Sequence, residues 1–305
     1  MTLVQPTPEM SLRIQKDLNE EPSKNEESLQ HIKEWLEKQP HLPQVDDDQR
    51  LITFLRGCKF SLEKTKRKLD MYYTMRTALP EFFANRDPMR PEIQEVFKNI
   101  QMPPLPGLTP EGRRVVVMRA SGNELGTVSE DFKAALMVGD IRLKEEAVGV
   151  AGDVYILDAT VATASQFSKV TPLLIKKFLV CVQEAYPVKL KEVHVVNVSP
   201  LVDSIVSFVK PFLKEKIRER IHIHSDGLDS LYKFVPKEML PEEYGGNAGP
   251  ISEINEQWRK KLESYKDWFL EQENVKADES KRQGKTRSYD DLFGVDGSFR
   301  KLTID

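Results

Sequence analysis

The sequence has little of what marks a secreted, disulfide-bonded or membrane-spanning protein. Its 305 residues include two cysteines, Cys58 and Cys181, which lie far apart without metal-ligand spacing, so we expect reduced, buried thiols. No apolar run approaches the roughly 18 residues that span a bilayer, and the N-terminus lacks the continuous apolar stretch of a secretory signal. With 30% charged residues and a mean hydropathy of -0.47, the chain is expected to be a soluble, cytoplasmic protein.

Catalytic and cofactor motifs are also missing. The sequence has no GxGxxG after a strand, no GxxxxGK[ST] loop and no GxSxG elbow. His222 and His224 alternate with isoleucines on one predicted strand, and His194 is the other nearby imidazole, so we expect hydrogen-bonded strand histidines rather than a metal site. The net charge of -3 argues against a general nucleic-acid binder. We therefore expect no catalytic residues, metal, cofactor or nucleic-acid partner.

The order of apolar patterns predicts an α/β protein with a helical N-terminal domain. Residues 1–24 are polar and are predicted to be flexible or to form a short helix. Residues 25–90 show the amphipathic periodicity of a small helical bundle. Within residues 91–250, a proline-rich loop (102–113) precedes strand patterns at 114–119, 153–158, 192–197 and 220–225, with helix patterns at 129–147 and 171–185. Such alternation predicts a mainly parallel sheet flanked by helices. Residues 251–305 form a predicted C-terminal helix and a tail whose docking the sequence leaves open.

One segment, PLVDSIVSFVKPFLKEKIRER (residues 200–220, the gate segment), places an apolar helix, a proline and a row of cations in direct succession. Its apolar residues recur at helical spacing: Leu201, Ile205, Phe208, Val209 and Phe212. Pro211 should break the helix near Lys210. From residue 176 to 224 there are nine Lys and Arg against five Asp and Glu, a local charge of about +4. An apolar helix on a hinge, rimmed by cations, is typical of a mobile lid over an apolar cavity that opens at an anionic membrane.

Apolar positions that could line such a cavity are abundant in the α/β region. They are Phe132, Ala135, Leu136, Gly139, Ile156, Phe167, Val170, Leu174, Phe178, Val182 and Val196. Ordinary core packing explains most apolar residues in any α/β protein. The gate segment is what favours a cavity over a filled core.

Three stretches together carry a family resemblance: DDDQRLITFLRGCKFSLEKTKRKLDMYYTMR, the segment from Tyr155 through the gate, and KPFLKEKIRERIHIH followed by LPEEYGG. In this order they resemble the CRAL-TRIO lipid-binding family, most of all its tocopherol- and retinaldehyde-carrying members. The resemblance implies an N-terminal helical domain and a lipid-binding α/β domain with a mobile lid helix. It also implies a non-enzymatic carrier that moves a hydrophobic small molecule (retinoid, tocopherol or similar lipid) between membranes. Ala135 and Gly139 stand where tocopherol-carrying members offer hydroxyls, so the cargo stays open.

The resemblance further implies a cleft that binds the headgroup of phosphatidylinositol bisphosphate. The matching residues are Lys189, Lys191, Lys216 and Arg220, with Lys59 beside Cys58, which occupies the family's third basic position. The expected partners are a lipophilic small molecule and an anionic membrane carrying phosphoinositide, and the chain is expected to be a peripherally membrane-associated monomer. Two alternatives stay open: a regulatory adaptor that reads phosphoinositide without carrying cargo, and an α/β enzyme acting on a lipid.

Overall fold

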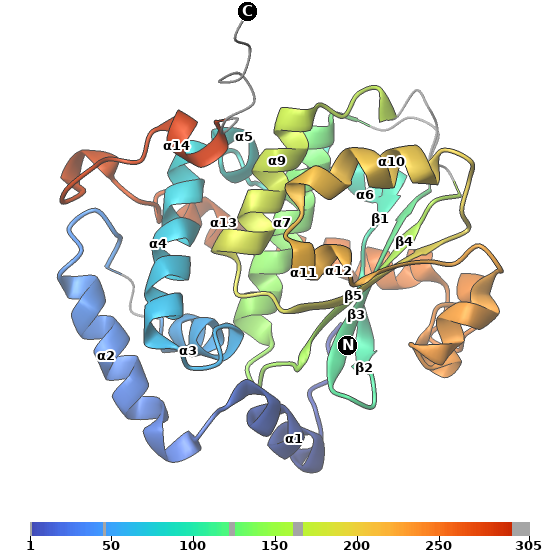
Figure 1. The fold of residues 1–305 in the computed structure, drawn as a ribbon, viewed down its shortest axis with the longest axis horizontal. Coiled ribbons are helices and arrows are strands. Elements are labelled where there is room, and N and C mark those ends of the chain that lie inside the picture. Colours follow the sequence, from blue (N-terminus) through green and yellow to red (C-terminus); the bar gives the residue numbers. More distant parts are fainter. Residues whose placement is uncertain (1, 45–46, 122–125, 161–166, 295–305) are drawn as a thin grey trace, which may run out of the picture.

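The computed structural model describes the chain apart from residues 1, 45–46, 122–125, 161–166 and 295–305. Within that part, six strands form one sheet: β1 (Ile100–Gln101), β2 (Pro104–Leu108), β3 (Arg113–Ala120), β4 (Gly152–Asp158), β5 (Leu190–Val196) and β6 (Ile221–Ile223). The strand order is β1-β3-β4-β5-β6, with β2 also pairing β3 (Figure 1). Strands β3 to β6 are parallel.

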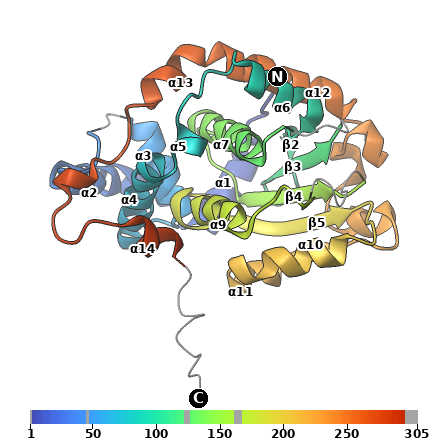
Figure 2. The same cartoon turned by 90° about the horizontal axis from the view of Figure 1, so that it is seen from above.

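Helices connect the parallel strands, as the alternating sequence pattern predicts. Helix α7 (Val128–Glu145) leads from β3 to β4, and α9 (Pro172–Val180) precedes β5. Helix α10 (Val202–Val209) and the short α11 (Glu215–Arg218) lie between β5 and β6. Figure 2 shows α10 and α11 on one face of the sheet and α12 (Ile251–Ser264) on the opposite side. The predicted α/β class is confirmed.

The proline-rich stretch at 102–113, predicted as a loop, instead contains β2. This strand runs antiparallel to β3, with Pro104 opposite Val116. Proline cannot donate a ladder hydrogen bond, which confines it to strands with one unpaired side. Because β2 pairs with β3 and lies off the main strand order, its two prolines are tolerated.

The N-terminal bundle consists of α2 (Asn25–Glu37), α3 (Asp48–Gly57), α4 (Leu62–Ala78) and α5 (Pro80–Phe83). Its apolar side chains form one cluster with Leu136 of α7 and with Tyr186, which follows α9. Helix α3 ends where a Cβ on Gly57 would lie 2.3 Å from the carbonyl oxygen of Pro187, so only glycine fits this close approach. The bundle is therefore packed directly against the sheet domain.

Of the two predictions for residues 1–24, a flexible segment or a short helix, residues 2–24 show the helix. Thr7 caps α1 (Pro8–Leu18) by accepting a hydrogen bond from the Met10 backbone, and Ile14 and Leu18 are buried. The Glu20 carboxylate pairs with Arg56 of α3 at 2.8 Å. Amphipathic spacing within α1 accounts for the burial of its apolar side chains.

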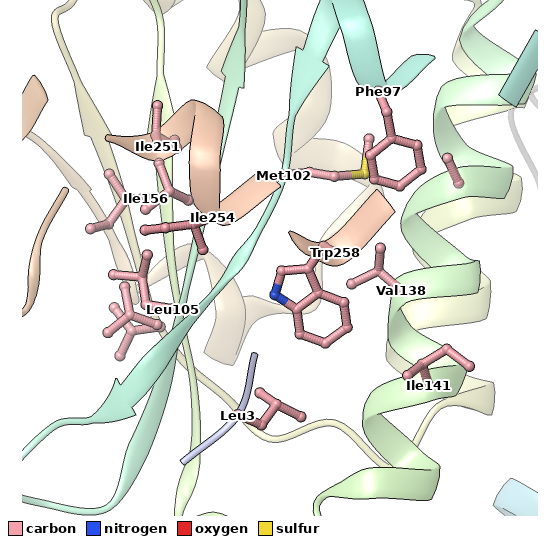
Figure 3. Close-up of a cluster of buried hydrophobic side chains, with 14 of the residues drawn as sticks. Leu3, Phe97, Met102, Leu105, Val138, Ile141, Ile156, Ile251, Ile254 and Trp258 are labelled. Atoms are coloured by element: carbon pink, nitrogen blue, oxygen red, sulfur yellow. The ribbon is translucent and has the colours of Figure 1, made fainter. Parts of the chain in front are cut away.

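The main core lies around Trp258 of α12, whose indole nitrogen donates to the Pro104 carbonyl at 2.9 Å. Figure 3 shows this side chain between the strands and α7, where Val138 and Ile141 face it. Helix α6 (Pro91–Asn99) adds Phe97 to the same cluster. The remaining turns of 3-10 helix here are η4 (Leu228–Lys233), η5 (Lys237–Met239) and η6 (Glu242–Tyr244).

The C-terminal segment returns to the helical bundle. After α13 (Lys266–Gln272), the backbone of Ala277 donates to Tyr73 of α4 at 3.1 Å, and η7 (Glu279–Lys281) follows. Phe293 of α14 (Tyr289–Phe293) is buried against the bundle, close to α9 (Figure 1). Docking of the tail, left open by the sequence, is thus observed up to residue 294. Among the described helices, none is long and apolar enough to cross a membrane.

Candidate binding cavity and gate

An apolar cavity of about 360 Å³ lies between the sheet and helices α7 and α9. Its strand wall is built by residues that alternate along each strand: Val116, Met118, Tyr155, Leu157 and Val193. The residues between them face the main core instead, because successive side chains of a strand point to opposite faces. This volume lies at the lower end of the range typical of small-molecule pockets.

Seven of the residues predicted for the cavity and its lid line this cavity: Phe132, Ala135, Leu136, Gly139, Phe178, Val182 and Val209. Phe132 of α7 and Phe178 of α9 stack with ring centroids 4.1 Å apart, which ties the two helices together at the cavity wall. A Cβ on Gly139 would meet the Tyr186 ring at 3.5 Å. Small residues on α7 therefore leave the space that bulkier side chains would fill.

Five predicted cavity residues, Phe167 on the gate and the four described next, are not among the residues that line it. Ile156 and Val196 lie on the opposite strand faces and belong to the main core, an assignment that sequence periodicity alone does not make. Leu174 packs against the helical bundle. Val170 is half-buried in the turn before α9. The period of two was available in the sequence, but which face bears the cavity depends on tertiary packing.

The gate segment breaks where Pro211 predicts. Helix α10 ends at Val209, a turn of 3-10 helix, η3 (Lys210–Phe212), follows, and α11 comes next. Val202 and Val206 pack on Val195 of β5 and on Ile221 of β6. This row of valines seats α10 on the sheet, and of α10 only its last residue, Val209, lines the cavity.

The other predicted lid residues are half-buried and lie outside the cavity wall: Leu201, Ile205, Phe208 and Phe212. The Phe208 ring meets Phe167 edge-on at 5.1 Å, so Phe167 packs on the gate rather than lining the cavity. These residues form a second apolar row beside the valines. The gate segment therefore contacts the sheet through the row of valines, and its second apolar row is only half-buried.

A glutamine holds the hinge of the gate. Gln183 lies in the π-helical turn η2 (Cys181–Ala185) that continues α9. Its amide donates to the Phe212 carbonyl at 3.1 Å and accepts from the Lys214 backbone at 2.9 Å. Lys68 of α4 in turn donates to the carbonyls of Gln183 and Tyr186. Sequence reasoning missed this clamp, because the partners of Gln183 lie 29 and 31 residues away along the chain.

The predicted basic residues gather around the start of β5. The Arg220 guanidinium donates to the carbonyl of Leu190, which separates Lys189 from Lys191. Lys216 is exposed on α11, one turn before Arg220. Lys59 is exposed at a left-handed turn (φ 53°) after α3. We refer to Lys59, Lys189, Lys191, Lys216 and Arg220 as the basic cluster.

Lys189 is the basic residue that the fold treats most unusually. Its ammonium is buried and has no hydrogen-bond partner in the described part of the chain. Burial, reinforced by the charge of Lys59, lowers the pKa of Lys189 to about 8. The same side chain lines the cavity. Lys189 therefore joins the cavity to the basic cluster.

Acidic residues of the N-terminal segment neutralise part of this surface. Asp17 of α1 lies 3.4 Å from the Lys191 ammonium, and Glu20 pairs with Arg56, which itself lines the cavity. Cys58 is buried, and burial raises the pKa of its thiol. Sequence reasoning missed Asp17 because it treated residues 1–24 as flexible.

The polar floor of the cavity consists of paired charges. Arg142 of α7 contacts Asp153 of β4 at 2.5 Å and Glu146 at 2.9 Å, and Glu146 also accepts from Arg114 of β3 at 2.7 Å. These four side chains are buried. Two arginines and two carboxylates balance each other, so the floor carries no surplus charge.

The three predicted strand histidines form a hydrogen-bonded stack. His194 of β5 contacts His224 at 2.9 Å and the Glu192 carboxylate at 3.2 Å, and its ring lies 5.1 Å from His222. Burial lowers the pKa of His194 to about 4, which keeps it neutral at ordinary pH. Among the described residues, no group of His, Cys, Asp and Glu has an arrangement that could hold a metal ion.

Comparison with known proteins places this geometry among relatives. The model of the CRAL/TRIO domain matches residues 100–246, and that of a Pinta-like UBA domain matches residues 21–93. The human "Alpha-tocopherol transfer protein-like" is 29% identical over 269 residues, 87% of this chain and 78% of that protein. Rat Clavesin-2 is 28% identical over 247 residues, 80% of this chain and 76% of that protein. The solved structure of Sfh5 shares the fold at a TM-score of 0.54 and 14% identity, covering 88% of this chain and all of that one.

Proposed function

The chain belongs to the CRAL/TRIO family, and on that premise we propose that it binds a hydrophobic small molecule in the cavity and transfers it between membranes. The apolar cavity, whose wall includes both Val209 at the end of α10 and Lys189 of the basic cluster, is the observation that supports this most. One of its relatives is named as tocopherol transfer protein-like. The name of a relative does not decide which lipid is the cargo of this chain.

The energetics explain why a gate is needed. A lipophile that buries on the order of 500 Å² of apolar surface is stabilised by roughly 12 kcal/mol relative to water. Relative to a bilayer the same burial gains almost nothing, since lipid tails are already apolar. Extraction therefore requires the gate segment to open at the membrane and to close in water, and the shape of the cavity decides which lipid is retained.

The basic cluster supplies the attraction to the membrane. Each cation near an anionic leaflet contributes about 1 kcal/mol, so four contribute roughly 4 kcal/mol, about a thousandfold in affinity. A phosphoinositide headgroup at Lys189 and Arg220 would sit beside the hinge. It favours the open gate to the extent that it binds the open state better than the closed one.

A substitution that fills the cavity tests whether a cargo molecule occupies it. Ala135 lines the cavity from α7, so Ala135→Phe places a ring in the cargo space. We expect organic extraction and mass spectrometry of gently purified wild-type protein to yield a stoichiometric lipophile, and the variant to yield little. Thermal unfolding serves as the folding control. An empty wild-type cavity under all purification conditions would instead favour a phosphoinositide-reading adaptor.

Docking is tested separately with the double variant Lys216→Ala, Arg220→Ala. Transfer of the extracted lipophile between phosphatidylcholine vesicles containing phosphatidylinositol bisphosphate should fall sharply, while cargo affinity stays near that of the wild type. Lys98→Ala, Lys260→Ala is the matched control, because it removes the same charge from two exposed lysines on α6 and α12. Raising the salt concentration should slow transfer by the wild type and the control alike. Equal transfer rates for the two double variants would disprove docking through this surface.

A further inference from the structure

The polar side chains on the cavity wall are almost all satisfied by the protein. Arg142 pairs with Asp153 and Glu146. Arg56 pairs with Glu20 and also donates to the Ala147 carbonyl at 2.6 Å. The Thr53 hydroxyl, on α3, donates to the Gln49 carbonyl at 2.8 Å. These groups therefore do not need a cargo molecule as a hydrogen-bond partner.

Tyr155 is different. It lies on β4 two residues after Asp153, so both side chains are on the strand face that bears the cavity, and both line it. In the described part of the chain its hydroxyl makes no hydrogen bond, although the ring is half-buried in the cavity wall. Burial and the nearby Asp153 carboxylate raise the pKa of Tyr155, which keeps the phenol neutral and able to donate.

Tyr155 lines the cavity, so a hydrocarbon cargo that covers its hydroxyl leaves the hydroxyl without a partner, at a cost of about 1–3 kcal/mol. A cargo atom that accepts a hydrogen bond at this position avoids that cost. The neighbouring floor favours an uncharged acceptor. Asp153 pairs with Arg142, and Glu146 pairs with both Arg142 and Arg114, so an anionic group beside Tyr155 would lie near Asp153 while both floor arginines are already paired.

We propose that Tyr155 is the polar anchor of the cargo, and that the cargo is a neutral lipophile of modest size carrying a hydroxyl or carbonyl oxygen. This inference rests on the proposed carrier function. The cavity volume of about 360 Å³ favours a single chain or compact ring system over a two-chain phospholipid. The oxygen of the cargo points to the floor at Tyr155, and its apolar part lies along Phe132, Phe178 and Val182 toward the hinge.

Lys189 offers the competing anchor, since its ammonium also lines the cavity without a partner. A fatty acid with its carboxylate at Lys189 would make the cargo anionic. The two anchors are distinguished by three ligands of equal chain length: dodecanol, dodecane and dodecanoate. Each is titrated into delipidated full-length protein loaded with the neutral dye Nile red, and dye displacement gives the affinity.

Dodecanol loses the hydration of its hydroxyl on binding and dodecane does not, so the ratio of the two affinities is compared between proteins. We expect dodecanol affinity relative to dodecane to be about tenfold higher in wild type than in Tyr155→Phe, the value of one net hydrogen bond. This variant keeps the ring and removes only the hydroxyl, so dodecane affinity should be unchanged. Tyr289→Phe, at an exposed tyrosine of α14, is the matched control and should behave as wild type.

Three outcomes would overturn the proposal. An alcohol preference that persists in Tyr155→Phe removes Tyr155 as the anchor. A preference for dodecanoate that disappears in Lys189→Ala assigns the anchor to Lys189 and the cargo to the anionic class. Displacement of the dye by none of the three ligands contradicts the carrier function itself, and with it this inference, whereas retained dodecane binding in Tyr155→Phe shows that the cavity is intact.

Discussion

One lysine of the proposed docking surface should titrate near neutral pH. Among the residues that the structure describes, the buried ammonium of Lys189 has no acceptor, and its pKa is about 8. The protonated form binds an anion, so binding to vesicles that contain phosphatidylinositol bisphosphate should weaken as the pH rises from about 7 to about 9. At the upper value roughly one molecule in ten keeps the charge. Loss of one cation near the surface lowers affinity about fivefold, which vesicle co-sedimentation across this range measures.

Substitutions at and around Lys189 separate its contribution to the pH dependence of binding from the titration of the lipid headgroups in the vesicle. Lys189→Arg keeps its charge throughout this range, so its affinity should depend much less on pH. Asp17→Asn should raise affinity, since the Asp17 carboxylate pairs with Lys191 and attracts Lys189. Asp229→Asn, which makes the same charge change at an exposed residue of η4, is the control. A steep pH dependence that survives in Lys189→Arg would show that another group titrates.

In the proposed carrier function, release of the cargo depends on the hinge between α10 and α11. Gln183 forms two hydrogen bonds with the backbone of this hinge, and each contributes about 0.5–1.5 kcal/mol net. Gln183→Ala should therefore increase the population with an open gate roughly tenfold. Hydrogen exchange of the amides in residues 202–218 should accelerate by the same factor, while exchange in β3 and β4 stays unchanged.

The neighbouring residue provides the comparison for this clamp. Glu184 pairs with the Lys214 side chain at 2.6 Å, but both side chains are about half exposed (42% and 56%), so this ion pair contributes little. Glu184→Gln should change gate exchange much less than Gln183→Ala. Equal effects of the two substitutions would mean that charge, rather than the amide clamp, holds the hinge.

At the scale of the element, the sequence predicts the helices and strands better than it predicts which of their faces lines the cavity. The Pro211 break and the parallel order of β3 to β6 follow from local rules that tertiary packing does not override. The assignment of Ile156 to the cavity was wrong because period two marks alternate faces without saying which one is hollow. Residues such as Gln183 and Asp17 escaped prediction because their partners lie far away along the chain.

At the scale of the whole molecule, one buried carboxylate connects the helical bundle to the sheet domain. Asp140 of α7 accepts hydrogen bonds from Tyr72 and Arg76 of α4, from Arg86, and from Tyr186 after α9, at 2.6–3.0 Å. It thus joins the helical bundle to the helix that forms the cavity wall. Arg76 and Arg86 hold the pKa of Asp140 well below its usual range despite its burial.

Removing this charge should loosen the bundle from the sheet domain. Asp140→Asn leaves two buried guanidinium groups without their counter-ion, and we expect a loss of about 3–5 kcal/mol in the free energy of unfolding, measured by urea denaturation at neutral pH. Asp267→Asn, at an exposed position of α13, should cost far less.

The pH dependence of the free energy of unfolding distinguishes the contribution of the Asp140 charge from that of its packing. Because the pKa of Asp140 is depressed in the folded state, its stabilisation is complete above the unfolded value of about 4 and is lost as the pH falls below it. Wild-type stability should therefore decline more steeply below about pH 4 than that of Asp140→Asn, whose side chain does not titrate. Parallel declines would show that Asp140 contributes through shape and hydrogen bonding alone.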